Sequence, residues 1–306
     1  MTPPLTVFAM PKSSRGLIAD IQRNALASWR WIDPHIEILI FAEDRTTHDL
    51  AAGLHVRVVE DHVERNEFGT PRVDYLFRRA TGHARSDVLC YVNADIILSS
   101  SLLLAAAKAA RRFEDFLLVG ERTDVPLREA LSFDESWERR VHLLADSVGR
   151  PHGPTGMDYF VFRRGMFDDM PPFAIGRPAW DNWCIADSRR KGIPVIDATR
   201  AVLAVHQDHD YSHVQGRRNG SWDGPEADFN RRLAGPTVGF YTLSAATWFL
   251  TERGTLLPNL RWRHLRKRWG VWRHARPPGG RSGAFPVRRG REGTSAAARG
   301  GQGVDR

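Results

Sequence analysis

The sequence has 306 residues and 42% hydrophobic residues, enough to build the core of one large domain or two ordinary ones. It contains no apolar run of about 18 residues, so no transmembrane helix is expected, and it lacks the pattern of an N-terminal secretory signal. Cys90 and Cys184 are the only cysteines, which excludes a disulfide framework or a cysteine zinc motif and favours a reducing cytoplasm.

The net charge of +8 is concentrated at the C-terminal end of the chain. From Leu260 onward there are 13 Lys and Arg against two acids, a charge of +11. The remaining chain, with 31 Lys and Arg against 34 acids, therefore carries 8 − 11 = −3. A body this close to neutrality does not indicate nucleic-acid binding.

Strand-like and helix-like stretches alternate along the first part of the chain. The apolar run 36–41 is typical of a strand buried on both faces, and Thr70 followed by Pro71 predicts a helix start. Strands are expected at 5–9, 36–41, 55–59, 88–92 and 116–120, and helices at 17–31, 47–52, 70–83 and 100–113.

The second part is less regular between residues 121 and 157, and then the alternation resumes. Strands are expected at 159–163, 195–197 and 202–206, and helices at 179–191, 225–234 and 241–252. This order predicts βαβ units and an α/β domain with a mostly parallel central sheet flanked by helices. We expect the domain to span 1–258, followed by a basic, Trp-rich segment at 259–276 and a disordered Gly-, Pro- and Arg-rich tail at 277–306.

The segment VLCYVNADIIL (88–98) places an acid, Asp95, just after a buried strand. Ligands bind beyond the carboxyl ends of the strands in an open parallel sheet, although Asn93 and Asp95 are also typical of a turn or a helix cap. No Gly-rich phosphate loop follows any strand. A carboxylate at this position therefore suggests that a divalent cation, Mn²⁺ or Mg²⁺, holds phosphate groups.

A second set of metal-ligand residue types occurs in VLAVHQDHDYSH (202–213). His206 ends an apolar run, and His209 follows in a loop that also contains Asp208, Asp210 and His213. Histidine is a common ligand of transition metals. The alternative interpretation is a hydrated polar loop.

Five segments together resemble the nucleotide-diphospho-sugar transferases of the GT-A type, in particular those similar to glycosyltransferase family 2. VNAD resembles the DxD motif of that family, with Asn93 in place of the first acid. The resemblance covers roughly residues 5–250. The segments that carry it are NEFGTP (66–71), YVNADI (91–96), GMDYFVF (156–162), PPFAIGRPAWDNW (171–183) and HQDHDYSH (206–213).

The resemblance implies roles for individual residues. Asp95 would bind the metal, Asn93 would bind ribose or diphosphate, and His206 or His209 would be the second metal ligand. The residues expected to line the nucleotide pocket are Glu43, Asp44, Arg23 and Asn66.

Asp181, in RPAWDNW, is the candidate for a catalytic base. Transfer with inversion needs a carboxylate close to the acceptor hydroxyl, and Pro178 places Asp181 in the first turn of a helix, where the dipole favours its ionised form. The resembled family has an acid here. An ordinary first-turn Asp is the alternative. Trp180, Asn182 and Asp158 are further candidates for contacts with donor or acceptor, although tryptophan is more often a core residue and Asp158 could serve a turn.

The sequence therefore predicts a hexosyltransferase-like glycosyltransferase, assisted by a divalent metal, with a nucleoside diphosphate sugar as donor. The acceptor would be a glycan, lipid or small molecule. Residues 260–276 suggest peripheral contact with an anionic membrane. Two other functions stay open: a nucleotidyltransferase of related fold, and a nucleic-acid-binding protein acting through the basic tail.

Overall fold

The computed structural model describes residues 4–60, 62–208 and 222–260. The predictions made for His209, for most of the segment 259–276 and for the tail lie outside these residues. Within them, none of the helices is both long and apolar enough to cross a bilayer.

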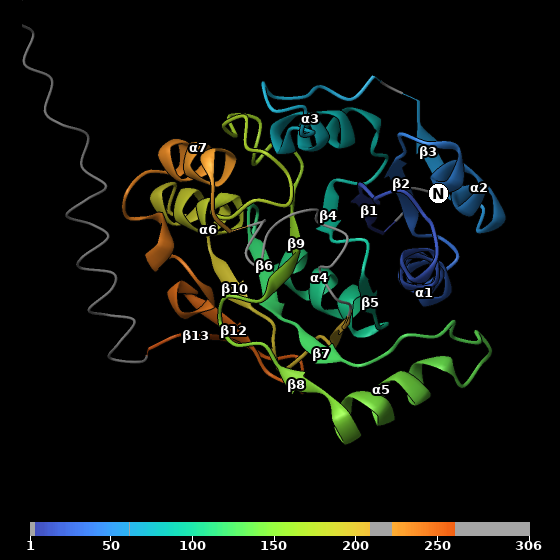
Figure 1. Ribbon diagram of the computed structural model, residues 1–306. Helices are drawn as coiled ribbons and strands as arrows, with labels where there is room; N and C mark the ends of the chain where they lie inside the picture. The colour runs from blue at the N-terminus through green and yellow to red at the C-terminus, as the bar shows by residue number, and fades with distance from the viewer. Residues whose placement is uncertain (1–3, 61, 209–221, 261–306) are drawn as a thin grey trace, which may run out of the picture.

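A nine-stranded sheet forms the centre of the described chain (Figure 1). Its strands are β1 (Thr6–Ala9), β2 (Glu37–Phe41), β3 (Arg57–Val59), β4 (Val88–Val92), β6 (Leu117–Glu121), β9 (Met157–Arg163), β10 (Val195–Asp197), β12 (Trp248–Leu250) and β13 (Leu256–Pro258). They are arranged in the order β13-β12-β10-β6-β9-β4-β1-β2-β3. Apart from β3, β12 and β13, these strands are almost completely buried, which explains their continuous apolar sequences.

Most pairs in this sheet are parallel, which confirms the predicted fold class. β9 is the exception inside the sheet, because it runs antiparallel to both of its neighbours, β4 and β6. β13 is antiparallel to β12 at one edge. Because β9 is reversed, its first residues lie at the edge where β4 and β6 end.

Helices cover both faces of the sheet (Figure 1). The core on one face is built with α3 (Val73–His83) and α6 (Trp180–Arg190), and α7 (Pro225–Ala234) packs against α6. The core on the other face is built with α1 (Leu17–Ile32), α2 (Arg45–Gly53) and α4 (Ser101–Arg112). The buried residues of α4 (Leu102, Ala105, Ala106 and Ala109) recur at helical spacing, as an amphipathic segment on a sheet requires, whereas α1 and α3 are buried over most of their length.

A second, four-stranded sheet lies beside the carboxyl edge of the first. Its strand order is β5-β11-β7-β8, with bounds β5 (Ile96–Leu98), β11 (Ala204–Gln207), β7 (Thr123–Val125) and β8 (Arg150–Pro151). The helix α5 (Trp137–Val148) packs against β7. Helix α5 and strands β7 and β8 were not predicted, because residues 121–157 show weak periodicity.

Two further expectations were wrong. Residues 241–252 do not form a helix: they contain a 3₁₀ turn (Leu243–Ala245) and strand β12, preceded by another 3₁₀ turn (Val238–Phe240). Helix α3 begins at Val73 rather than Thr70, and Pro71 instead forms a β-bridge with Arg65. In both cases pairing with a neighbouring strand or loop replaces the local helical preference.

Candidate active site

Polar side chains from three strands meet at the carboxyl edge of the main sheet. Asn93 follows β4, Arg122 follows β6, and Asp158 is the second residue of the reversed strand β9. The backbone N–H of Asn93 donates to the carbonyl of Asp158 (2.9 Å), which joins the ends of β4 and β9. The topology thus brings together residues that are far apart in sequence.

Asp158 is held on both sides. The Asn93 side-chain amide donates to its Oδ1, and Arg122 Nη1 lies 2.7 Å from its Oδ2. Arg122 also donates to Asp124 Oδ1 at 2.9 Å, and Asp124 Oδ2 lies 2.8 Å from His152 Nδ1. Arg122 therefore joins two buried or half-buried carboxylates, and Asp158 is a fixed part of the site rather than a turn residue.

His206 lies between Asp95 and Asp124. Its Nδ1 is 2.9 Å from Asp124 Oδ1, its Nε2 is 3.6 Å from Asp95 Oδ2, and the imidazole is only 4% exposed. The sheet register explains this position, because β11 pairs His206 with Asp124 of β7 on one side and with Ile96, next to Asp95, on the other. The predicted meeting of Asp95 and His206 is present in the fold.

The charges in this group stabilise one another. Burial would raise the pKa of Asp124, but His152, Arg122 and His206 more than offset it, so the pKa is lowered. Burial would lower the pKa of His206, but the Asp95 carboxylate more than offsets that, so its pKa is raised. The group is therefore a coupled set of opposite charges.

Asp181 lies in the first turn of α6, as predicted, but its electrostatics differ from the prediction. Burial raises the pKa of Asp181 to about 6, and the negative charge of Asp158 adds to the effect. The backbone N–H of Asn182 donates to its Oδ1 (2.8 Å) without restoring the usual value. Desolvation thus outweighs the helix N-terminus, whose benefit is largest at solvated ends.

The backbone at the start of α6 is strained. Ala179 has φ = 85° and ψ = −20°, in the left-handed region that residues with a Cβ rarely adopt. Such strain costs on the order of 1–3 kcal/mol and occurs preferentially at functional sites. It sets the direction in which Trp180 and Asp181 leave the chain.

Trp180 belongs to the core. Its ring lies 5.1 Å from Tyr91, 5.2 Å from Phe160 and 6.3 Å from Phe77, and only 6% of the residue is exposed. The expectation that Trp180 contacts donor or acceptor is therefore corrected, because the side chain is buried among these rings. Asn182 likewise has a structural contact: its amide donates to the Tyr241 carbonyl at 2.7 Å.

Tyr91 connects the strand end to the start of α6. Its hydroxyl donates to Asn93 Oδ1 at 2.9 Å, while its ring packs edge-on against Trp180. Burial raises the pKa of Tyr91, and the negative charges of Asp158, Asp95 and Asp181 contribute. All three acids are therefore close enough to act on one hydroxyl.

The residues predicted to line a nucleotide pocket come from separate elements: Glu43 and Asp44 follow β2, Arg23 lies on α1, and Asn66 lies between β3 and α3. Asp44 accepts from the backbone N–H of Thr47 (3.0 Å) and caps α2, and Glu43 pairs with Arg65. Asn66 accepts from Phe68 and Thr70 and donates to Glu226 at 3.0 Å. Arg23 is exposed on α1. The hydrogen bonds of Asp44 stabilise a local turn, whereas Asn66 orders its own turn and joins it to Glu226 of α7. Within the described chain, none of these bonds reaches the Asp95 group.

Sequence reasoning missed Arg122, Asp124 and His152. A signal was present for the first two: FLLVGERTDV (116–125), like VLCYVNAD, is an apolar strand followed by polar residues. Two such patterns on strands of one mostly parallel sheet predict a shared site at its carboxyl edge.

No family model matches the chain, and no curated protein matches it. Solved structures that match include the mannosyltransferase PcManGT from Pyrobaculum calidifontis in complex with GDP-Man and Mn²⁺, at 12% identity and a TM-score of 0.45 over 69% of this chain and 59% of that chain. TarS 1–349 of S. aureus matches at 14% identity and a TM-score of 0.39, over 68% and 59%.

Glucosyl-3-phosphoglycerate synthase from Mycobacterium tuberculosis, with Mn²⁺, UDP and phosphoglyceric acid, matches at 13% identity and a TM-score of 0.41, over 71% and 74%. The chain thus spans less than two thirds of the first two of these proteins. With TM-scores below 0.5, these likenesses carry none of the reasoning that follows.

Proposed function

We propose that the chain is a glycosyltransferase that moves a sugar from a nucleoside diphosphate sugar to an acceptor hydroxyl, with help from a divalent cation. The observation that carries the proposal is the facing pair of Asp95 Oδ2 and His206 Nε2, 3.6 Å apart at the carboxyl edge of the sheet. The sequence contains no Gly-rich phosphate loop that could hold a diphosphate instead of a metal.

The donor set fits Mn²⁺ or Mg²⁺. Asp95 supplies a carboxylate oxygen and His206 an imidazole nitrogen, while Asp124 stands behind His206 at its other ring nitrogen. A carboxylate on the far side of a ligating histidine fixes the ring and its tautomer. The described residues contain no group of three His, Cys, Asp or Glu side chains that could hold a metal, so diphosphate oxygens and water would complete the coordination, as is usual for Mg²⁺.

When bound, the cation would neutralise charge on the departing nucleoside diphosphate. Arg122, 14% exposed and fixed by Asp124 and Asp158, would keep Asp158 in place for contact with sugar hydroxyls. Asn93 donates to Asp158 and accepts from Tyr91, so it orders the strand end in place of a second acid.

Asp181 would accept the proton of the acceptor hydroxyl. A base is most effective when its pKa lies near the working pH, and burial raises the pKa of Asp181 to about 6. The same carboxylate stays ionised at pH 7. The charge of Asp158 acts on Asp181, and the charges of Asp181 and Asp95 both act on Tyr91, which supports a common site for the base and the metal pair.

The test is a thermal-shift panel of UDP-, GDP-, ADP- and dTDP-linked sugars, each with and without Mn²⁺. At least one donor should raise Tm, and Mn²⁺ should increase the shift. Asp95→Ala should remove the Mn²⁺-dependent part, whereas Asp115→Ala, an exposed acid before the amino end of β6, should keep it. If no donor stabilises the wild type, the proposal fails.

A further inference from the structure

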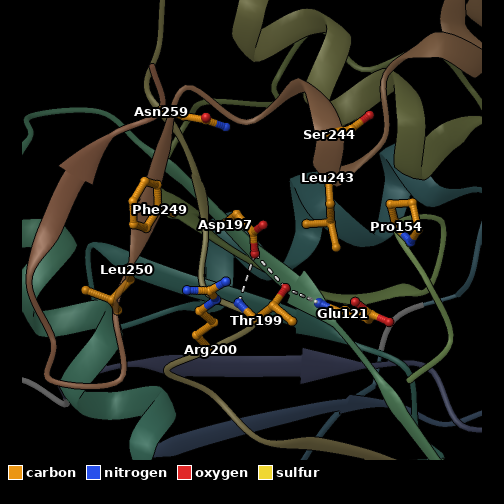
Figure 2. A pocket seen from close by; sticks show the side chains of 10 residues that line it. All are labelled: Glu121, Pro154, Asp197, Thr199, Arg200, Leu243, Ser244, Phe249, Leu250 and Asn259. Carbon is orange, nitrogen blue, oxygen red and sulfur yellow. Dashed lines mark hydrogen bonds between the residues drawn. The ribbon is translucent and has the colours of Figure 1, made fainter. Parts of the chain in front are cut away.

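A second hollow lies on the carboxyl edge of the same sheet, over β6, β10 and β12 (Figure 2). It has a volume of about 340 Å³, within the range of roughly 300–1,000 Å³ typical of small-molecule pockets. None of the predicted site residues lines it. The lining residues are Glu121, Pro154, Asp197, Thr199, Arg200, Leu243, Ser244, Phe249, Leu250 and Asn259.

The pocket contains two carboxylates, those of Asp197 and Glu121, and each is oriented by hydrogen bonds to only one of its two oxygens. Asp197 Oδ1 accepts from the Thr199 backbone N–H at 2.9 Å, and Glu121 Oε1 accepts from the Gly153 N–H at 2.5 Å. Among the residues that the structure describes, the other oxygen of each acid has no hydrogen-bond donor. The pocket therefore offers two fixed acceptor oxygens.

Arg200 contributes a cationic guanidinium group, which donates hydrogen bonds, whereas the two carboxylates accept them. Its side chain is exposed and forms no ion pair within residues 4–60, 62–208 and 222–260. Figure 2 shows it beside Asp197 and Thr199 at one side of the pocket. Since two carboxylates and one guanidinium line the pocket, their sum is −1. This sum disfavours a phosphate or other anion, and the mixed donors and acceptors favour a neutral ligand with many hydroxyl groups.

The rest of the lining is apolar. Pro154, Leu243, Phe249 and Leu250 contribute side chains, and in Figure 2 the Phe249 ring stands on one wall, across from Leu243 and Pro154. A pyranose or cyclitol ring has C–H faces and a hydroxyl rim, so it matches an apolar wall combined with fixed polar atoms. A flexible lipid chain would leave the two acids unpaired, which is costly.

The pocket is connected to the candidate active site by the backbone and by hydrogen bonds. Glu121 directly precedes Arg122, which holds Asp158, and the Leu243 N–H donates to the Pro154 carbonyl at 3.1 Å. Asn182, next to Asp181, binds the Tyr241 carbonyl and so fixes the same loop to the start of α6. A ligand in this pocket would lie on the side of Asp158 away from β1 and β2.

We infer that this pocket binds a neutral, hydroxyl-rich ring, a sugar or a cyclitol. Binding itself is independent of catalysis. Its assignment as the acceptor, or as the acceptor's neighbouring sugar unit, rests on the proposed glycosyltransferase function.

The experiment is saturation-transfer NMR on the full chain with the methyl glycosides of glucose, galactose, mannose and N-acetylglucosamine, and with myo-inositol. Glucuronate and glucose 6-phosphate are the anionic counterparts. At least one neutral ring should bind, and anionic rings should bind more weakly. Asp197→Asn, which keeps Oδ1 for Thr199, and Phe249→Leu should each raise Kd by about tenfold. Arg253→Gln, an exposed arginine outside the pocket, should leave Kd unchanged.

Donor binding separates the two proposals. The pocket variants should keep the Tm shift caused by the nucleotide sugar, because the pocket lies outside the Asp95 pair. Neutral-ring binding with no donor shift would support the pocket and refute the transferase. The inference would be overturned if no neutral ring binds or if an anionic ring binds more tightly. It would also be overturned if neither pocket variant changes the Kd of the ring that binds.

Discussion

Asp124, on strand β7, and Asp181, in the first turn of α6, lie in opposite environments. Asp124 lies against an arginine and two histidines, with Arg122 Nε at 2.9 Å, His152 Nδ1 at 2.8 Å and His206 Nδ1 at 2.9 Å. Asp181 is desolvated, and the nearby charged group that acts on it is another acid, Asp158. The pKa of the first is lowered, and the pKa of the second is raised to about 6.

This contrast separates two roles for one residue type. A carboxylate that stays ionised across the physiological range can hold cations, whereas one with a pKa near 6 can take up a proton during a reaction. Environment, not residue identity, assigns the roles. Substitutions at Asp181 and at Asp124 therefore test the two environments separately.

The largest effect is expected from Asp181→Asn. The amide cannot accept the proton of the acceptor, so transfer should fall by about 10²–10⁴-fold, while donor binding stays intact. Single-turnover transfer and donor thermal shift measure the two quantities. Asp115→Asn, an exposed acid remote from the site, is the control. Transfer at the wild-type rate would remove Asp181 from the role of base.

The pH profile should report the same group. Because the pKa of Asp181 is about 6, transfer per enzyme should be flat above pH 7 and fall by about tenfold per pH unit once the carboxylate is protonated. The measurement is kcat/KM between pH 4.5 and 8.5 at saturating Mn²⁺. A profile whose acid limb lies near pH 4 would show that the base is an ordinary, solvated carboxylate.

On the other side of the contrast, Asp124→Asn should weaken Mn²⁺ binding by about 10–100-fold without removing a metal ligand. The amide removes the negative charge that orients and polarises His206 through Nδ1. Isothermal titration of Mn²⁺ in the presence of nucleoside diphosphate measures the effect. Asp124→Glu tests whether charge alone restores binding. Equal Mn²⁺ affinity in wild type and Asp124→Asn would contradict a supporting role.

Local sequence patterns were sufficient to predict the α/β fold and the positions of some residues of the candidate site. Asp95 and His206 each follow an apolar run, and the rule that ligands bind at carboxyl strand ends brings them together without any knowledge of the register. Asp181 follows a proline at a helix start in the same way. These residues could be predicted because each lies at a boundary that the local pattern defines.

The remaining features depend on contacts that are distant in sequence. The reversal of β9 has no local signature, yet it carries Asp158 to Asn93. The pairing of β7 with β11, which sets Asp124 against His206, joins two short strands that are weak in isolation. Trp180 looks like a sugar platform in sequence, but the rings of α3, β4 and β9 cover it. Solvation likewise decides the pKa of Asp181, and solvation follows only from the assembled core.

The smallest expected effect is on the free energy of unfolding, and it has opposite signs for the replacement of Asp181 and of Asp124. A raised carboxyl pKa means that the folded state prefers the protonated acid, so Asp181 lowers stability as the pH rises from its unfolded value of 3.8 to about 6. Asp181→Asn should therefore stabilise the fold at pH 8, on the order of 1 kcal/mol after allowance for partial exposure, and should have little effect at pH 4.

The lowered pKa of Asp124 has the reverse consequence. Its ionised form contributes stability above the unfolded pKa, and that contribution is lost as the pH falls through the folded pKa. Asp124→Asn should therefore destabilise the fold at pH 8, and the gap to wild type should narrow toward pH 4. Urea unfolding of both variants at the two pH values measures this. Because the two substitutions are chemically identical, equal signs at pH 8 would mean that the two environments do not differ as described, whereas opposite signs would locate the energetic cost of the site at Asp181.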